Sequence, residues 1–446
     1  MKKLLFIYLS IFTVFILSCG NKVMNPTESV DGITYYDVNN TETAKFNIAN
    51  FNENNGIDSI ASSEFKKIAE SSHAIVYIQS GKSFDMNTVK ELFTKFEANY
   101  DEEVRIYGEP ISFPTINNDK LVFLIYNFYP KSEGYFAGFF NPSDFYDDKP
   151  DTLNKGKYMY INITTISYTD LIVGTMLHEF QHLINASVNI INGGKAMDLW
   201  LNEALSESTS VLFSPFTADD RKKFVSLFHY YSFYSWYIDK IIGYKENSIY
   251  FSYSGSSVFM RWILEKGGRE AIRDIANSDP SLETRARLVN SVQGLNIGNS
   301  VEEIFKSWIK DMYNGKVSDI KFDTMDFMDD RFDRTLMDSS QRLPLAPGGF
   351  IIYDANKYNL NNQSIKTEPL DAANNIYLAW NGNFDSVDVE GKINANDVIW
   401  IAPIKISTTP STSKSEMLNF DYSKFSRMPI DKVLTPEEVI RAKSRK

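Results

Sequence analysis

The sequence predicts an α+β protein with a mixed β-sheet lobe, a helical lobe and a small all-β module at the C-terminal end. Three observations support this class. Apolar runs bounded by turn residues precede residue 165, helical spacing of apolar residues dominates 168–315, and short strand patterns separated by turns follow residue 340. With 446 residues, 43% of them hydrophobic and 23% charged, the chain has ordinary globular composition and is long enough for two or three domains.

The first twenty residues, MKKLLFIYLSIFTVFILSCG, have the features of an export signal. Two lysines precede an apolar run over 4–17 that is too short to span a bilayer comfortably. Cys19 is the only cysteine, and Ile-Leu-Ser-Cys resembles the bacterial lipobox, at which the thiol is acylated. We therefore expect a signal peptide over 1–18 and a polar tether over 19–33; a buried free cysteine is the alternative.

The net charge and the predicted localisation limit the possible partners of the chain. The formal net charge is −11 and no cluster of Lys and Arg occurs, so the sequence argues against nucleic-acid binding. Membrane contact is expected through the N-terminal lipid anchor at Cys19, without help from a polybasic patch. A lipoprotein of the bacterial cell envelope, at the outer membrane or cell surface, is the predicted localisation, and Gly20 after the cysteine favours the outer membrane.

The elements follow in chain order. Residues 34–70 are rich in Asn and predict an irregular or β segment, and 71–335 form the expected main domain. Within it, turn-bounded apolar runs predict strands, and apolar residues at helical intervals predict helices. The predicted strands are 73–81, 120–129 and 155–164, and the predicted helices are 86–103, 171–187, 200–213, 219–242, 255–268, 269–279 and 301–315. Residues 340–446 predict a β-rich accessory module and tail, with strands in 348–355, 374–382 and 397–407.

The stretch MLHEFQHLIN holds two of the four histidines of the chain, His178 and His182, with Glu179 between them. On a helix, positions four apart lie on the same face, so both imidazoles can reach one Zn²⁺. The glutamate between them is then positioned to act on a water molecule at the metal. An amphipathic helix with this spacing by chance is the alternative, and a catalytic site needs a third protein ligand.

A second block, WLNEALSES, offers that ligand. Glu203 and Glu207 are one helical turn apart, and Asn202 adjoins the first of them. The intervening segment allows one helix to end and a second to present its face to the first. Glu203 can then complete a set of two histidines and one glutamate, and Glu207 can accept the remaining ring N–H of a ligating histidine. A solvated helix face is the alternative for both glutamates.

The two blocks together resemble the zincin metallopeptidases with a glutamate as third ligand, and among them the hyicolysin-like family. The resemblance extends more loosely over 70–315, and it leaves 20–70 and the last hundred residues uncovered. One departure is Ser208, where the family often has an aromatic residue. A zincin-like fold and a zinc-dependent endopeptidase that acts on protein or peptide substrates are what this resemblance implies.

Residue by residue, the resemblance implies that His178, His182 and Glu203 bind Zn²⁺ and that Glu179 is the general base. A catalytically weak or inactive lipoprotein that uses the same scaffold as an adhesin or binding module is the alternative function, with the C-terminal β region as its binding part.

By analogy with the wider group, Glu207 orients His178 and Asn202 orients His182. Tyr253 occupies the position of a recurrent tyrosine and is the predicted oxyanion donor, with His229 and Tyr250 as competing candidates.

Two aromatic stretches remain open. We interpret 228–238 as core packing, with a carbohydrate-stacking platform or groove wall as the alternative. Residues 134–140, GYFAGFF, predict either simple packing or an edge strand or loop that pairs with an extended substrate.

Overall fold

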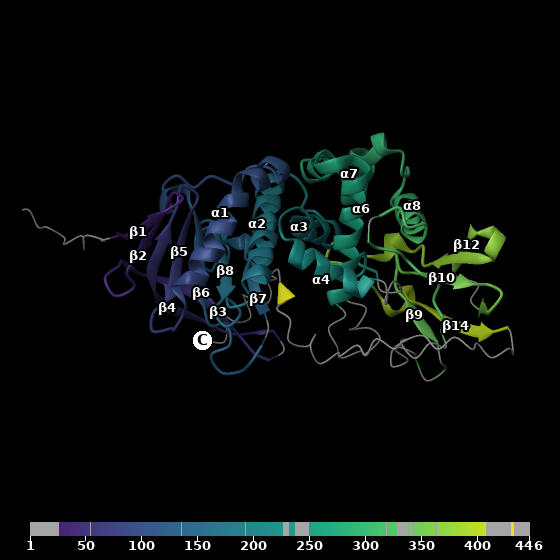
Figure 1. Cartoon of the computed structure of the whole chain (residues 1–446), viewed down its shortest axis with the longest axis horizontal. Helices are drawn as coiled ribbons and strands as arrows, with labels where there is room; N and C mark the ends of the chain where they lie inside the picture. Colours follow the sequence, from purple (N-terminus) through teal and green to yellow (C-terminus); the bar gives the residue numbers. More distant parts are fainter. Residues whose placement is uncertain are drawn as a thin grey trace, which may run out of the picture.

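The computed structural model describes residues 26–406 and 430–431, apart from 54, 135, 192, 226–231, 237–248, 318, 328–337, 339, 341 and 362–363. The predicted signal peptide and Cys19 therefore lie outside the described residues. The fold is α+β, as predicted: a sheet lobe, a helical lobe and a smaller all-β region follow one another along the long axis of the molecule (Figure 1). No described helix is both long and apolar enough to cross a membrane.

A nine-stranded mixed sheet forms the first lobe. Its path runs β1-β2-β4-β5-β6-β8-β7-β15, and β3 pairs only with β4. The pairs β5–β6, β6–β8 and β7–β15 are parallel, and the others are antiparallel. The strands are β1 (Pro26–Val30), β2 (Ile33–Tyr36), β3 (Thr43–Phe51), β4 (Ile57–Glu70), β5 (Ala74–Gln79), β6 (Leu121–Tyr126), β7 (Phe136–Phe140), β8 (Tyr158–Asn162) and β15 (Ile430–Asp431).

The central strands are apolar throughout because both of their faces are covered. Val76 and Ile78 of β5 belong to the core under the helices, whereas Ile75 and Tyr77 belong to a second core on the opposite face. That second core also contains apolar residues of β3 and β4, including Phe51. Continuous apolar runs are what strands buried on both faces require.

Helices α1 (Met86–Tyr107) and α2 (Thr169–Ile191) pack beside one another against the sheet (Figure 1). Asp85 caps the first helix by accepting a hydrogen bond from the backbone N–H of Asn87. Gly108 ends it at φ +112°, and a Cβ at this position would lie 2.8 Å from Cγ2 of Val188. Glycine is therefore required where α1 turns away against the end of α2.

The helical lobe is built around α3 (Leu199–Phe213), which is buried from Trp200 to Ser210 on nearly every side. Its hydroxyls donate hydrogen bonds back to the helix's own carbonyls, so that small polar residues can fill a buried helix; examples are Ser208 to Leu205 and Ser210 to Glu207. The other helices of this lobe are α4 (Pro215–Val225), α6 (Ile249–Ala276), α7 (Thr284–Val292) and α8 (Val301–Tyr313).

The C-terminal β region consists of two three-stranded sheets with the orders β10-β13-β12 and β11-β14-β9. One side packs on α8, where the rings of Trp308 and Phe350 are 5.9 Å apart. A loop of this region accepts a hydrogen bond at the start of α3, from Leu199 N–H to the carbonyl of Val389. The strands are β9 (Leu343–Leu345), β10 (Phe350–Asp354), β11 (Tyr358–Asn361), β12 (Lys366–Asp371), β13 (Ile376–Trp380) and β14 (Ile399–Lys405).

The predicted helix over 219–242 is wrong at 232–236, which are described and not helical. Phe233, Tyr234 and Trp236 are all buried there, whereas positions so close together on one helix point in different directions. Core packing, the preferred interpretation of this aromatic stretch, is confirmed for these three residues. The two helices predicted over 255–279 are parts of α6, separated at Gly268, whose backbone is not helical.

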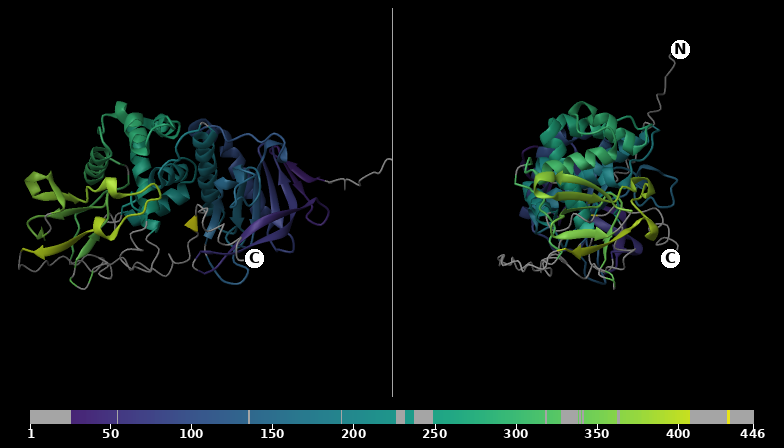
Figure 2. Two further views of the ribbon diagram at one scale, coloured as in Figure 1. Left: turned by 180° about the vertical axis from the view of Figure 1, so that it is seen from behind. Right: turned by 90° about the vertical axis from the view of Figure 1, so that its right-hand side faces the viewer.

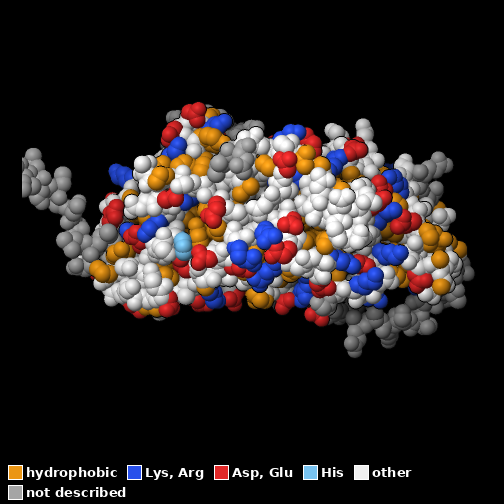
Figure 3. All heavy atoms as spheres, turned by 90° about the horizontal axis from the view of Figure 1, so that it is seen from above, with side chains coloured by type: hydrophobic (Ala, Val, Ile, Leu, Met, Phe, Trp, Pro, Cys, Tyr) orange, Lys and Arg blue, Asp and Glu red, His pale blue; other side chains and the backbone are white. Residues whose placement is uncertain are grey.

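Acidic and basic side chains are intermixed on the face seen in Figure 3, and neither kind forms a patch of its own. Several of these groups are paired. Lys95, for example, contacts Glu91 at 2.7 Å and Asp170 at 2.8 Å, which links α1 to the start of α2.

Candidate metal centre

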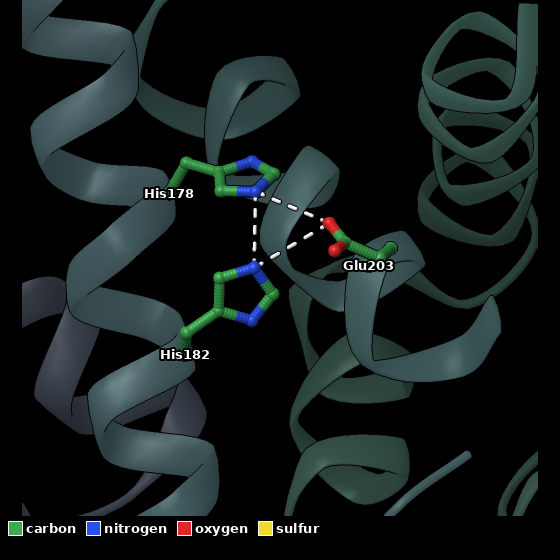
Figure 4. Close-up of side chains that lie close together, drawn as sticks. All are labelled: His178, His182 and Glu203. Carbon is green, nitrogen blue, oxygen red and sulfur yellow. Dashed lines mark hydrogen bonds and ion pairs between the residues drawn. The ribbon is translucent and has the colours of Figure 1, made fainter. Parts of the chain in front are cut away.

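Three donor atoms from α2 and α3 converge between these helices (Figure 4). His178 and His182 project from successive turns of α2, and Glu203 faces them from α3. The Nε2 atoms of the two histidines are 3.1 Å apart, and Oε2 of Glu203 lies 3.3 Å from that of His178 and 3.4 Å from that of His182. Sequence spacing predicted the histidine pair, and the structure brings the predicted third residue to it.

These separations fit a single metal ion. Ligand atoms about 2.0–2.1 Å from a tetrahedral centre are roughly 3.4 Å from one another, close to the three observed distances. All three side chains are buried, and among the described residues they form the single group of histidine, cysteine or carboxylate side chains able to hold an ion. Without an ion, three buried electron-pair donors would face one another with no cation between them, which is energetically unfavourable.

Glu203 is prepared to act as an anionic ligand. Burial raises the pKa of its carboxyl group, but the charges and hydrogen bonds of His182 and His178 outweigh burial and lower this pKa to about 2. The carboxylate is therefore ionised at neutral pH, the form in which a carboxyl group binds a metal.

The outer ring nitrogens of both histidines have partners at the predicted positions. Oε1 of Glu207 lies 3.4 Å from Nδ1 of His178, and Oδ1 of Asn202 lies 3.2 Å from Nδ1 of His182. Oxygen acceptors at Nδ1 hold the proton there and leave Nε2 available for a metal. The geometry thus matches the predicted orienting roles, which remain predictions.

Ser206, which neither sequence block had indicated as a site residue, also contacts the centre. Its hydroxyl lies 2.9 Å from Nδ1 of His182 and donates a hydrogen bond to Oε1 of Gln181. Ser206 is one turn after Asn202 on α3, so both side chains face the same histidine. This helical spacing was the one signal in the sequence that could have identified it.

Arg221, from α4, is the second site residue that the sequence motifs did not reveal. Its Nε and Nη2 donate to the two carboxylate oxygens of Glu207 at 3.0 and 3.1 Å, and both side chains are buried. Burial raises the pKa of Glu207, but the positive charge of Arg221 and the contact with His178 lower it below its usual value. The guanidinium therefore keeps the partner of His178 ionised.

Tyr253, the predicted oxyanion donor, lies beside the metal centre on α6. Its ring is 5.8 Å from that of His178 in an edge-on arrangement and 4.9 Å from that of Trp236. The guanidinium carbon of Arg221 lies 5.1 Å from the ring centroid, a cation–π distance. Of the competing candidates, His229 and the side chain of Tyr250 lie outside the described residues.

Two more carboxyl groups are fully buried, one on α1 and one on α2, the helix that carries His178 and His182. Glu179 lies on α2 directly after His178, and Glu103 lies on α1. Neither carboxylate oxygen of Glu103 has a hydrogen-bond partner within the described part of the chain. Burial raises the pKa of Glu103 well above its usual value, although the charge of His178 opposes the shift. Burial thus favours the neutral form of Glu103.

Glu103→Gln is expected to stabilise the protein increasingly as pH rises. The raised pKa means that the folded state binds a proton that the unfolded state releases above about pH 4.5, so this group's contribution to stability is lost as pH increases. The variant should gain up to about 1.4 kcal/mol over the wild type for each pH unit between the unfolded and folded pKa values. Denaturant unfolding of both proteins between about pH 4 and pH 8 tests this. A free energy of unfolding that changes with pH by the same amount in both proteins would contradict it.

Comparison with known proteins gives a distant relative. The chain is 24% identical over 217 residues to the neutral metalloprotease ShpI of Staphylococcus hyicus, a match that covers 44% of this chain and 47% of that protein. It thus spans less than half of the relative's length. No family model matches the chain. Part of the chain is thus similar to a metalloprotease, and the chain contains a buried group of two histidines and one glutamate that could hold a metal ion.

Proposed function

We propose that the protein is a zinc-dependent endopeptidase, held at the bacterial envelope by a lipid on Cys19. The observation that carries this proposal is the set of three buried donor atoms, 3.1–3.4 Å apart, on α3 and on the helix that also holds Glu179. Two imidazoles and one carboxylate match the ligands that catalytic zinc prefers. The similarity to a neutral metalloprotease supports the same activity.

Each residue of the centre then has a defined role. His178, His182 and Glu203 would hold Zn²⁺, which when bound supplies a Lewis acid that activates water and polarises the scissile carbonyl. Glu179 accepts a proton from the attacking water and donates it to the leaving amine. Its burial, shared with its neighbours on α2, keeps bulk water from competing for that proton.

Positions around the metal ligands complete the proposal. Glu207 and Asn202 hold the ring orientations of the two histidines through Nδ1. Tyr253 stands beside His178 and is the proposed donor to the developing oxyanion. Extended segments of proteins or peptides are the proposed substrates, and nucleic acid is not a proposed partner because the chain is acidic.

Metal analysis and a chelation assay test the function. Protein beginning at Gly20 should contain about one zinc per chain and cleave casein or a peptide library. A chelator should abolish cleavage, and added Zn²⁺ should restore it. Protein that binds one zinc and cleaves no peptide would instead support the alternative, a lipoprotein that binds its target without hydrolysis.

A further inference from the structure

The strand β15 is the one described part of the chain beyond residue 406, and it lies away from the C-terminal β region. Ile430 pairs with Phe136 and Asp431 with Gly138, so β15 extends the large sheet as a parallel neighbour of β7. Figure 1 shows it in yellow, between β7 on one side and α4 on the other, and the view from behind in Figure 2 shows the same order.

β7 is the strand of the sheet that lies against α2, the helix that carries His178 and His182. A Cβ on Gly138 would lie 2.9 Å from Cγ2 of Thr175, which is one helical turn before His178 on α2. On its inner side β7 pairs with β8, through Gly138, Phe139 and Phe140. The other edge of β7 faces away from β8, and β15 occupies it.

We propose that β15 (Ile430–Asp431) is an intramolecular inhibitor, which occupies the edge of β7 where an extended peptide substrate would pair. This inference rests on the proposed peptidase function. One strand edge offers its N–H and C=O groups to one partner at a time, and strand addition is a common way for a protein to bind an extended peptide. Substrate and the chain's own segment therefore compete for β7.

The contact has the properties of a reversible inhibitor. The described pairing joins Ile430 with Phe136 and Asp431 with Gly138, and an edge strand can leave without disrupting the pairs inside the sheet. The segment is linked to the rest of the chain, however, and linkage gives it an effective concentration of the order of millimolar. We expect it to raise the apparent KM for peptide substrates and to leave kcat unchanged, because substrate at saturation displaces it.

The test separates the segment after the protein has folded. A site-specific protease sequence is inserted between residues 406 and 430 of the chain that begins at Gly20, and the zinc-loaded protein is assayed before and after the cut. Cutting should lower the apparent KM several-fold at constant kcat. A synthetic peptide of residues 424–437, added to the cut protein, should inhibit competitively. The control carries a scrambled insertion that the protease does not recognise.

A point variant tests the same contact without an insertion. Ile430→Pro removes the backbone N–H and disfavours strand pairing, and should lower the apparent KM, whereas Ile430→Val keeps a strand-forming residue and should match the wild type. An active enzyme whose KM is unchanged by cutting and by proline would overturn the inhibitor role alone. Absence of cleavage before and after the cut would overturn the peptidase function, and the inhibitor role with it.

Discussion

Glu179→Gln is expected to lower kcat for peptide cleavage by about 10²- to 10⁴-fold, the contribution typical of a general acid–base group. Gln has nearly the same size as Glu and fits the same buried place on α2, but it cannot accept the proton of the attacking water. The three metal-binding side chains are other residues, so the variant should still bind about one zinc per chain. Steady-state kinetics and metal analysis on the same preparations measure both quantities.

Glu91→Gln on the exposed side of α1 is the matched control, because its side chain is 47% exposed and outside the proposed chemistry. It should retain wild-type kcat and metal content. A Glu179→Gln protein with nearly normal kcat would show that another group moves the proton. Loss of zinc together with activity would place Glu179 in the metal site and not in proton transfer.

Much of the fold was predictable because its signals are local. The runs that became β5, β6 and β8 are apolar and bounded by turn residues, and α1, α2, α3 and α8 carry apolar residues at helical intervals. α7 (Thr284–Val292) was missed, since two of its four buried residues, Thr284 and Arg287, are polar and the apolar spacing is therefore weak. The stretch at 134–140 remained ambiguous because β7 is buried on both faces and shows no alternation.

The site residues also differ in whether local sequence signals reveal them. His178, Glu179 and His182 are recognisable from spacing within one helix, and Glu203 from a second short block. Arg221 could not be recognised from residue spacing, because its role depends on how α4 packs beside α3. A lysine or arginine on a helix is usually exposed, and no local pattern indicates that this one is buried against Glu207.

Arg221→Met is expected to destabilise the folded protein by about 3–5 kcal/mol, the usual cost of leaving one partner of a buried ion pair without its counter-charge. The change removes both hydrogen bonds to Glu207 and the guanidinium beside Tyr253, while the unbranched Met side chain retains much of the volume. Zinc affinity should also fall, by about 10- to 100-fold, because the partner of His178 loses its orientation. Denaturant unfolding and competition with a metal-binding dye measure the two effects.

A double-mutant cycle separates the charge from the packing. Glu207→Gln removes the negative charge and retains an oxygen that can accept from Nδ1 of His178, so adding it to Arg221→Met should recover most of the lost stability. Arg221→Lys should fall between wild type and Arg221→Met, since an ammonium group cannot bond both carboxylate oxygens in the same fork. A double variant whose loss of stability equals the sum of the losses in the single variants Arg221→Met and Glu207→Gln would show that the pair is not energetically coupled. Full recovery of stability with zinc affinity still reduced would instead show that Arg221 keeps Glu207 ionised and in place, and that through Glu207 it fixes the ring of His178 toward the metal.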